Sequence, residues 1–213
     1  MKKIAIFGAG GFGREVACLI EKINQREPQW DIVGFYDDSK PVGTTNEMGT
    51  VLGGMDALNS VTEPLAVVIA IGTPSTLKAV HERITNPAIY FPNIIDPDVV
   101  IQHPATVHFG QGNIVANKCA FTVNITIGDF NVFNGTVGVG HDATIGNYNV
   151  VMPSVKLAGD VHLGDLNFIG MMTGVVQGVK IGNNTRIGAG SIVMRKTRDG
   201  YLYMGNPARK VEL

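Results

Sequence analysis

The feature that most constrains this chain is an apolar residue at every sixth position across its second half, fifteen times without a break. These repeat positions are Phe109, Val115, Phe121, Ile127, Phe133, Val139, Ile145, Val151, Leu157, Leu163, Ile169, Val175, Ile181, Ile187 and Val193. A period of six does not fit the 3.6 residues of a helical turn, but it is a multiple of the strand period of two. The repeat therefore predicts a coil with three six-residue sides per lap, each side a short strand that ends in a turn.

A longer period of eighteen residues lies on top of the first and predicts how successive laps meet. Four asparagines keep this spacing, and we expect their amides to form a ladder in which each bonds the next lap. They are Asn113, Asn131, Asn149 and Asn167. Glycine follows many repeat positions, which suits a corner where φ is positive or where backbones approach closely. A right-handed parallel β-helix is the alternative, although its laps are usually longer and less regular.

The first part of the chain has a different pattern, in which strand and helix signals alternate. We expect strands at 3–7, 32–36, 65–71 and 88–91, and helices at 14–24 and 75–84, the second capped by Ser75. This βαβ alternation predicts a small parallel sheet of Rossmann-like type. Asp and Pro interrupt both patterns near 92–97. The predicted domains are therefore residues 1–95, an α/β domain, and residues 96–213, a β-helix.

Gly8, Gly10 and Gly13 form a GxGxxG motif between the first strand and the first helix. Glycine lets a backbone approach a pyrophosphate, and a helix N-terminus offers free N–H groups. Asp37 and Asp38 end the second strand, where a carboxylate accepts bonds from a ribose or a base. The alternative is a tight turn beside a solvated acidic turn. The candidate substrate-binding residues of this domain are Gly10, Gly11, Phe12, Gly13, Asp37, Asp38, Gly72 and Thr73.

Composition narrows the classes of partner. A net charge of -1 and a pI near 6.5 argue against nucleic acid. No apolar run is long enough to span a membrane, and the glycines before Arg14 break any signal-peptide core. Cys18 and Cys119 form no disulfide framework, which suits a reducing cytoplasm. We therefore expect a cytoplasmic protein with small-molecule partners, without nucleic-acid or membrane partners.

The repeat units themselves resemble a known family. Ile145-Gly146-Asn147-Tyr148-Asn149-Val150 and Ile181-Gly182-Asn183-Asn184-Thr185-Arg186 are similar to the hexapeptide repeats of left-handed β-helix acyltransferases over residues 98–213. With the glycine motif, the strand end 34–38 and the segment 70–74, the whole chain resembles one bacterial subfamily, the sialic-acid O-acetyltransferases and UDP-amino-sugar N-acetyltransferases. The resemblance implies a left-handed coil and acetyl-CoA as donor. It also implies a sugar or nucleotide-sugar acceptor, and a homotrimer with active sites between adjacent coils.

His141 is the candidate general base. It stands two residues after repeat position Val139, so its side chain should project outward from a corner. Gly159 is the same corner one lap later, which leaves room for a thioester. A histidine titrates near neutral pH, and Asp142 could fix its tautomer. The alternative is a surface histidine beside a solvated acid, but both residues match the family's catalytic pair.

The resemblance assigns further residues by motif. Gly159, Met171 and Ala189 match positions that contact acetyl-CoA, and Asn134 matches a polar residue near the reacting centre. The segment 205–210 resembles the family's C-terminal part, whose basic residues either face CoA phosphates or form a charged tail. Val150 stands where some members carry a second histidine, so a two-histidine relay is not expected. No cysteine or serine is placed as a nucleophile, which favours direct transfer.

Two other function classes compete with an acetyltransferase. A metal-dependent lyase of the carbonic-anhydrase type needs three histidine ligands near an interface, and His141 has no partner histidine at a neighbouring corner, so no metal is expected. A nucleotide-sugar- or NAD-binding module with a non-catalytic coil is the other, although the first domain is short for a dinucleotide fold. We expect a trimer because a lone prism would expose Phe130, Tyr148 and Met171.

Overall fold

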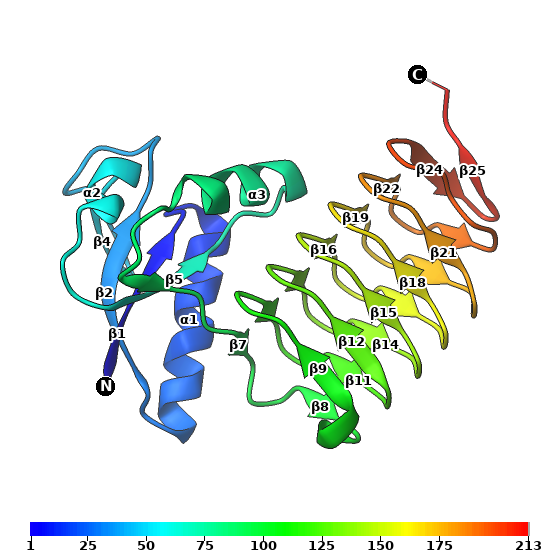
Figure 1. Ribbon diagram of the computed structural model, residues 1–213, viewed down its shortest axis with the longest axis horizontal. Helices are drawn as coiled ribbons and strands as arrows, with labels where there is room; N and C mark the ends of the chain where they lie inside the picture. The colour runs from blue at the N-terminus through cyan, green and yellow to red at the C-terminus, as the bar shows by residue number, and fades with distance from the viewer. Residues whose placement is uncertain (213) are drawn as a thin grey trace. The chain divides into compact units, whose positions relative to one another are not determined.

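A computed structural model describes residues 1–212, which divide into two compact units. The first is Met1–Pro97 and the second begins at Asp98, two residues beyond the expected boundary. The first unit is α/β and the second is a coil of short parallel strands (Figure 1). The predicted fold class, a Rossmann-like domain followed by a left-handed β-helix, is confirmed.

The first unit is a six-stranded sheet in the order β3-β4-β2-β1-β5-β6. All neighbouring strands are parallel except β3 and β4. Its elements are β1 (Lys2–Phe7), α1 (Gly11–Arg26), β2 (Trp30–Tyr36), β3 (Thr45–Asn46), β4 (Gly49–Gly53), α2 (Met55–Asn59), β5 (Leu65–Ile69), α3 (Pro74–Arg83) and β6 (Ile89–Tyr90). The apolar runs of the central strands β1 and β5 are buried, as expected for parallel strands covered on both faces.

The helices of this unit begin earlier than the sequence suggested. α1 starts at Gly11, so Gly11, Phe12 and Gly13 form its first turn instead of a preceding loop. α3 has Thr73 as N-cap and Pro74 at its first position, which corrects the expected cap at Ser75. Proline suits that position because its missing N–H would have no helical partner. The short β3, β4 and α2 were not predicted, since two to five residues carry too little periodicity.

The coil, whose first short strand at Ile94–Ile95 comes just before Asp98, stacks its strands in three parallel sheets, with the laps running from green to red in Figure 1. Paired residues lie eighteen apart, as in Val139 beside Leu157. The short strands are β7 (Ile94–Ile95), β8 (Val100–Ile101), β9 (Val107–Phe109), β10 (Ile114–Val115), β11 (Ala120–Phe121), β12 (Ile125–Ile127), β13 (Val132–Phe133), β14 (Gly138–Val139), β15 (Thr144–Ile145), β16 (Val150–Val151), β17 (Lys156–Leu157), β18 (His162–Leu163), β19 (Phe168–Ile169), β20 (Gly174–Val175), β21 (Lys180–Ile181), β22 (Arg186–Ile187) and β23 (Ile192–Val193). A 3₁₀ turn, Pro104–Thr106, precedes β9, and the hairpin β24 (Leu202–Gly205) and β25 (Ala208–Lys210) ends the coil.

The repeat positions form the core of the coil. All are buried except Phe109, which is partly exposed. The asparagine ladder is confirmed: the side-chain oxygen of Asn131 accepts the backbone N–H of Asn149 and also its side-chain amide, both at 2.9 Å. The same bonds join Asn113 to Asn131 and Asn149 to Asn167, and all four residues are fully buried. These bonds satisfy amides that would be costly to bury unpaired.

A second ladder, not predicted, runs along a corner of the coil. The side-chain oxygen of Asn147 accepts the backbone N–H of Asp129 at 2.8 Å, and Asp165 accepts that of Asn147 at 2.7 Å. Asn183 continues the series by accepting the N–H of Asp165. The eighteen-residue spacing of these side chains was a visible signal for the ladder.

The corners adopt left-handed backbone conformation three residues after each repeat position from Phe109 to Ile187, as at Thr136 (φ 65°) and Asp142 (φ 60°). The glycines directly after repeat positions do not have positive φ. They allow close approach instead: a Cβ on Gly128 would lie 2.7 Å from the carbonyl oxygen of Gly146. Of the two roles expected for these glycines, close approach is therefore correct.

Candidate functional site

The candidate base lies on one corner of the coil, which we call the histidine corner: residues 122–124, 140–142 and 158–160, stacked in three laps. His141 Nδ1 is 2.7 Å from Asp142 Oδ2, and the two side chains are about half exposed. The Asn124 amide donates to Asp142 Oδ1 at 3.1 Å. The hydrogen bond from His141, followed by that from Asn124, lowers the pKa of the Asp142 carboxyl.

The left-handed conformation of Asp142 is part of this arrangement. Aspartate tolerates that region better than most residues because its short side chain bonds locally. Asp142 therefore serves as the turn residue of the corner and also as the partner of the adjacent imidazole. With Nδ1 bonded to the carboxylate, Nε2 is the nitrogen available to a substrate proton.

Gly159 lies one lap beyond His141 and is buried. A Cβ placed on Gly159 would overlap Nε2 and Cε1 of the imidazole. We expected its bare Cα to leave room for a thioester, but in the structure the imidazole ring itself lies over it. Asp160, the next residue, donates its backbone N–H to the carbonyl of His141 at 2.7 Å. The fold thus holds the imidazole from below by a glycine and from the side by a carboxylate.

The other β-helix candidates lie on a different corner, which we call the methionine corner: residues 134–136, 152–154, 170–172 and 188–190. Met171 is 46% exposed, and Ala189, one lap later, is also exposed. The Asn134 amide lies 3.5 Å from the sulfur of Met152. Strand β14 separates this corner from the histidine corner, a path on the order of 15–20 Å at the rise of an extended chain. A single chain therefore does not bring Asn134 together with His141.

Two residues differ from what the sequence suggested for the exposed surface. Phe130 is 1% exposed, and its ring stacks on that of the partly buried Tyr148, with 5.5 Å between the ring centroids. The expectation that a lone prism would expose Phe130 is therefore wrong, whereas Met171 is exposed. Val150, where a second histidine was considered, is fully buried on β16.

The glycine motif of the first unit combines two kinds of glycine. Gly8 has φ +106° and Gly13 leaves no room for a Cβ beside the Gly8 carbonyl, so the fold requires both. By contrast, a Cβ on Gly10 or Gly72 would have no neighbour within 4 Å. These bare backbones lie at the carboxyl ends of β1 and β5, next to the start of α1 and of α3. Open glycines at such strand ends are typical of a site where a ligand approaches the backbone.

Asp37 is bound within its own unit, and its contacts hold the glycine turn. Its Oδ2 accepts the N–H of Ala9 at 2.8 Å, and its Oδ1 accepts the hydroxyl and N–H of Ser39. Burial alone would raise the pKa of Asp37, but the hydrogen bonds of Ser39 and Ala9, helped by Lys40, lower it overall. The carboxylate therefore stays ionised and ties the end of β2 to the glycine motif.

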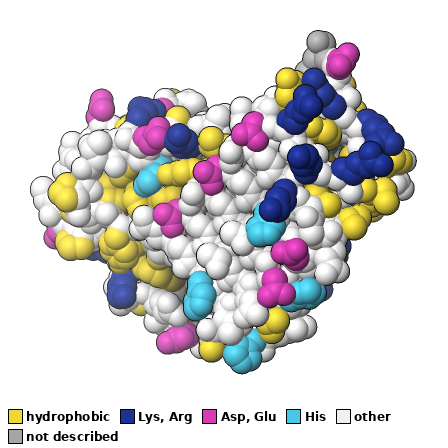
Figure 2. All heavy atoms as spheres, turned by 45° about the vertical axis from the view of Figure 1, so that its right-hand side comes forward, with side chains coloured by type: hydrophobic (Ala, Val, Ile, Leu, Met, Phe, Trp, Pro, Cys, Tyr) yellow, Lys and Arg dark blue, Asp and Glu magenta, His cyan; other side chains and the backbone are white. Residues whose placement is uncertain are grey.

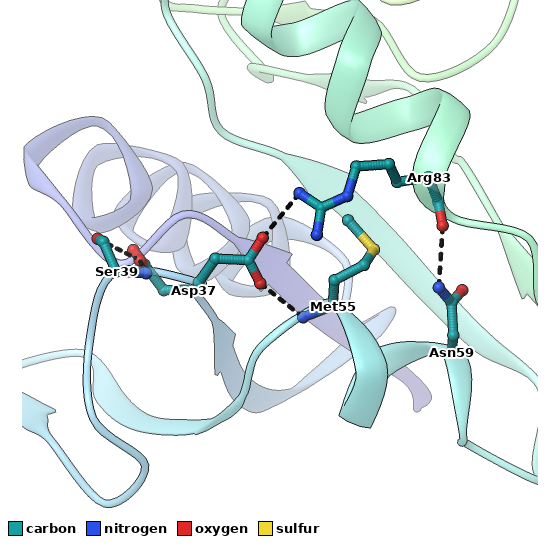
Figure 3. A network of polar contacts seen from close by, with 6 residues as sticks. Asp37, Ser39, Met55, Asn59 and Arg83 are labelled. Carbon is teal, nitrogen blue, oxygen red and sulfur yellow. Dashed lines mark hydrogen bonds and ion pairs between the residues drawn. The ribbon is translucent and has the colours of Figure 1, made fainter.

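Asp38 has a different set of partners, and Figure 3 labels two of them, Met55 and Arg83, together with Asp37. Its Oδ1 accepts the N–H of Met55 at the start of α2, and its Oδ2 pairs with Arg83 at the end of α3, at 2.8 Å. A pocket of about 380 Å³ lies here, lined by Asp37, Asp38, Lys40, Leu52, Met55 and Arg83 among others. Sequence reasoning identified the acids but missed Arg83, which stands 45 positions away from Asp38 along the chain.

Two searches of residues 1–212 gave negative results. No group of three or more His, Cys, Asp or Glu side chains is placed to hold a metal ion. No helix of these residues is long and apolar enough to cross a bilayer.

These features are similar to those of known proteins. Residues 3–84 match the PglD N-terminal domain family. No curated protein sequence gives a significant match. Among solved structures, the acetyltransferase domain of PglB from Neisseria gonorrhoeae FA1090, in complex with acetyl coenzyme A, is 27% identical with a TM-score of 0.87, and 99% of each chain is covered.

Two further structures match along the whole chain. PerB from Caulobacter crescentus, in complex with CoA and GDP-perosamine, is 27% identical with a TM-score of 0.90 and covers 100% of this chain and 98% of its own. WeeI from Acinetobacter baumannii AYE is 27% identical with a TM-score of 0.88, covering 99% and 100%. The chain is therefore an acetyltransferase that combines a hexapeptide-repeat coil with an N-terminal region matching the PglD N-terminal domain family, and it is similar along its whole length to PglB and PerB.

Proposed function

We propose that this enzyme transfers the acetyl group of acetyl-CoA to the amino group of a nucleotide-activated amino sugar, with His141 as general base. The observation that carries the proposal is the His141–Asp142 pair, held at 2.7 Å on an exposed corner with the ring over Gly159. A positioned base of this kind is what an amine needs to attack a thioester at neutral pH.

The first unit is proposed to bind the nucleotide. The open glycines Gly10, Gly11 and Gly72, with Phe12, Gly13 and Thr73, offer backbone N–H groups at helix starts to a diphosphate. Asp37 and Asp38 are proposed to contact the nucleoside from the end of β2. The ligands of PerB, CoA and GDP-perosamine, support an acyl carrier and a nucleotide-linked amino sugar as the two substrates.

The transfer is proposed to be direct. The acceptor nitrogen attacks the thioester carbonyl, its N–C bond forms as the C–S bond breaks, and its proton passes to Nε2 of His141. Asp142 stabilises the imidazolium, which then returns the proton to the CoA thiolate. Backbone N–H groups at Gly159 are proposed to stabilise the oxyanion.

A homotrimer is proposed because the candidate residues divide between two corners. Gly159 accompanies His141, whereas Met171, Ala189 and Asn134 belong to the methionine corner at the other end of β14. A groove between two coils would join the histidine corner of one copy to the methionine corner of the next, where acetyl-CoA would lie. Light scattering at micromolar concentration tests this, and a monomer that retains full activity would contradict the shared site.

The decisive assay measures release of CoA thiol from acetyl-CoA with GDP-, UDP-, dTDP- and CMP-linked amino sugars. We expect release with at least one of them, a product heavier by one acetyl group, and no release when the same acceptor is already N-acetylated. The His141→Ala variant controls for spontaneous transfer to the amine. Transfer that is equally fast to the N-blocked acceptor would show a hydroxyl acceptor and overturn the proposed N-acetylation.

A further inference from the structure

The last laps of the β-helix differ in charge from the rest of the molecule. Residues 186–210 contain six cations and one anion, Asp199, a net charge of +5 within a chain whose total is -1. The remaining residues therefore carry -6. In Figure 2 the Lys and Arg side chains gather at the end of the coil that carries the C-terminus, with hydrophobic side chains among them. We call this surface the basic end: Arg186, Arg195, Lys196, Arg198, Arg209 and Lys210, all exposed.

Within residues 1–212, no carboxylate pairs with the cations of the basic end. Among residues 1–212, no carboxylate lies within 4.0 Å of any of the six. The nearby Asp199 bonds the backbone and amide of Asn183 instead. Arg186 lies over the ring of Phe168 and Lys210 over that of Tyr201, contacts that leave their charge in place.

Exposed apolar side chains accompany the charges. Met194 is 56% exposed, Met204 is 50% exposed and Tyr201 is 40% exposed. Aromatic and flexible apolar side chains beside a polybasic cluster are the combination that holds proteins at an anionic bilayer surface, where the charges meet headgroups and the apolar groups enter the interface. The net charge of the whole chain hid this local concentration.

The distribution of the cations distinguishes a surface from a pocket. Arg186 is on β22, Arg195 and Lys196 follow β23, and Lys210 is on the terminal strand β25. Strands β22 and β25 belong to one sheet and β23 to the next, so the cations are spread over two sides of the coil at its end. A single small ligand with a few phosphates contacts only one of those sides, whereas a flat anionic surface meets the whole end.

We propose that the basic end docks the enzyme reversibly on an anionic lipid bilayer. The partner is defined by its chemistry, a surface of negatively charged headgroups above an apolar interior. The interaction needs no spanning helix and is weakened by salt, because screening shortens the reach of surface charges to about 8–10 Å at physiological ionic strength. The docking does not depend on which acceptor the enzyme acetylates.

Vesicle co-sedimentation of the whole protein tests the proposal. We expect binding to vesicles that contain phosphatidylglycerol, loss at high salt, and little binding to pure phosphatidylcholine. The triple variant Arg186→Gln, Arg195→Gln, Arg198→Gln should bind roughly 10²-fold more weakly, since each cation contributes about five-fold. The double variant Met194→Ser, Met204→Ser should bind several-fold more weakly with its salt dependence retained.

The matched control is Lys2→Gln, Lys78→Gln, Lys118→Gln, which removes three cations outside the basic end and should bind vesicles like the unmodified protein. Equal losses in the two triple variants would overturn the proposal. It would equally be overturned if the basic-end variant raised KM for acetyl-CoA while vesicle binding was absent, which would assign these cations to CoA phosphates. Tighter binding to duplex DNA than to anionic vesicles at the same salt would overturn it too.

Discussion

The two units of this chain position their polar side chains in different ways. In the β-helix, the same bonds recur in every lap, as in the ladder from Asn113 to Asn167, so no single outward corner residue is needed for folding. In the first unit, each turn depends on one contact, such as Asp37 holding Ala9. The difference teaches that the repeating scaffold leaves the side chain of the proposed base, His141, outside the bonds that join its laps, whereas in the α/β unit the proposed acceptor-binding residue Asp37 also holds the glycine turn.

The sharpest test of that separation is the substitution His141→Ala. We expect kcat/KM to fall by roughly 10² to 10⁴, or about 3–5 kcal/mol, the usual contribution of a positioned base. The unfolding midpoint and the oligomeric state should not change, because the side chain is exposed and fills no core position. Steady-state kinetics measures kcat/KM, and thermal unfolding measures the midpoint. A variant that keeps more than about a third of the activity would place the base elsewhere.

The substitution Gly159→Ala tests whether the corner position next to the imidazole tolerates a side chain as other corner positions do. The new methyl group overlaps Nε2 and Cε1 of His141, so the ring must leave its position beside Asp142. We expect kcat to fall on the order of 10²-fold, as is typical when a reacting group is misplaced by an ångström. Gln177→Ala, the same corner one lap further on, is the control and should be near normal. Equal activity of the two variants would contradict the proposed role of the glycine.

Asn149→Ala tests the structural half of the comparison. The amide bonds Asn131 on one side and accepts from Asn167 on the other, and all three are fully buried. Removing it leaves buried donors and acceptors unpaired, so we expect a loss of about 2–3 kcal/mol in the free energy of unfolding. Urea unfolding measures it, with the exposed Thr144→Ala as control. A loss below about 0.5 kcal/mol in the free energy of unfolding would mean that water satisfies the amides that Asn149 leaves unpaired.

Asp37→Ala should show the opposite behaviour to His141→Ala, by affecting binding and stability together. We expect KM for the nucleotide sugar to rise on the order of 10-fold and KM for acetyl-CoA to stay nearly constant, because the glycine turn loses its anchor. An equal rise in both constants would contradict this.

The pH dependence of stability gives a smaller signal from the same residue. The folded pKa of Asp37 is lowered, so its contribution is present above the unfolded value near 3.9 and is lost as pH falls below it. Since the group is partly exposed, we expect less than about 1 kcal/mol. Unfolding of the variant and the unmodified protein between pH 3 and pH 7 measures the difference, which should close at the acid end.

The sequence was informative where periodicity carries the structure. Fifteen repeat positions and four asparagines were sufficient to predict the coil, its core and its buried ladder. The second ladder was missed because its members alternate between Asp and Asn. The exposure of Phe130 was misjudged because a corner position alone does not tell what covers a ring.

The site was predictable in part, for physical reasons. His141 was identified by its match to the family's catalytic pair together with its outward register, but the contact between its ring and Gly159 depends on side-chain direction, which spacing does not give. Arg83 was invisible because its pairing with Asp38 joins residues 45 positions apart, and α2 because its five residues carry too little periodicity. Which corners meet in the assembly is a property of several copies, so a single chain gives only the separation between them.

The way the coil ends has a consequence for the fate of the protein in a crowded solution. A stack of parallel strands leaves an open edge at its last lap, and an identical open edge on a neighbour would let copies join end to end into fibres. Here β24 turns back through β25 in antiparallel direction, with Arg209 and Lys210 on the outermost strand. Two such positively charged ends repel each other, which prevents one coil from extending into the next.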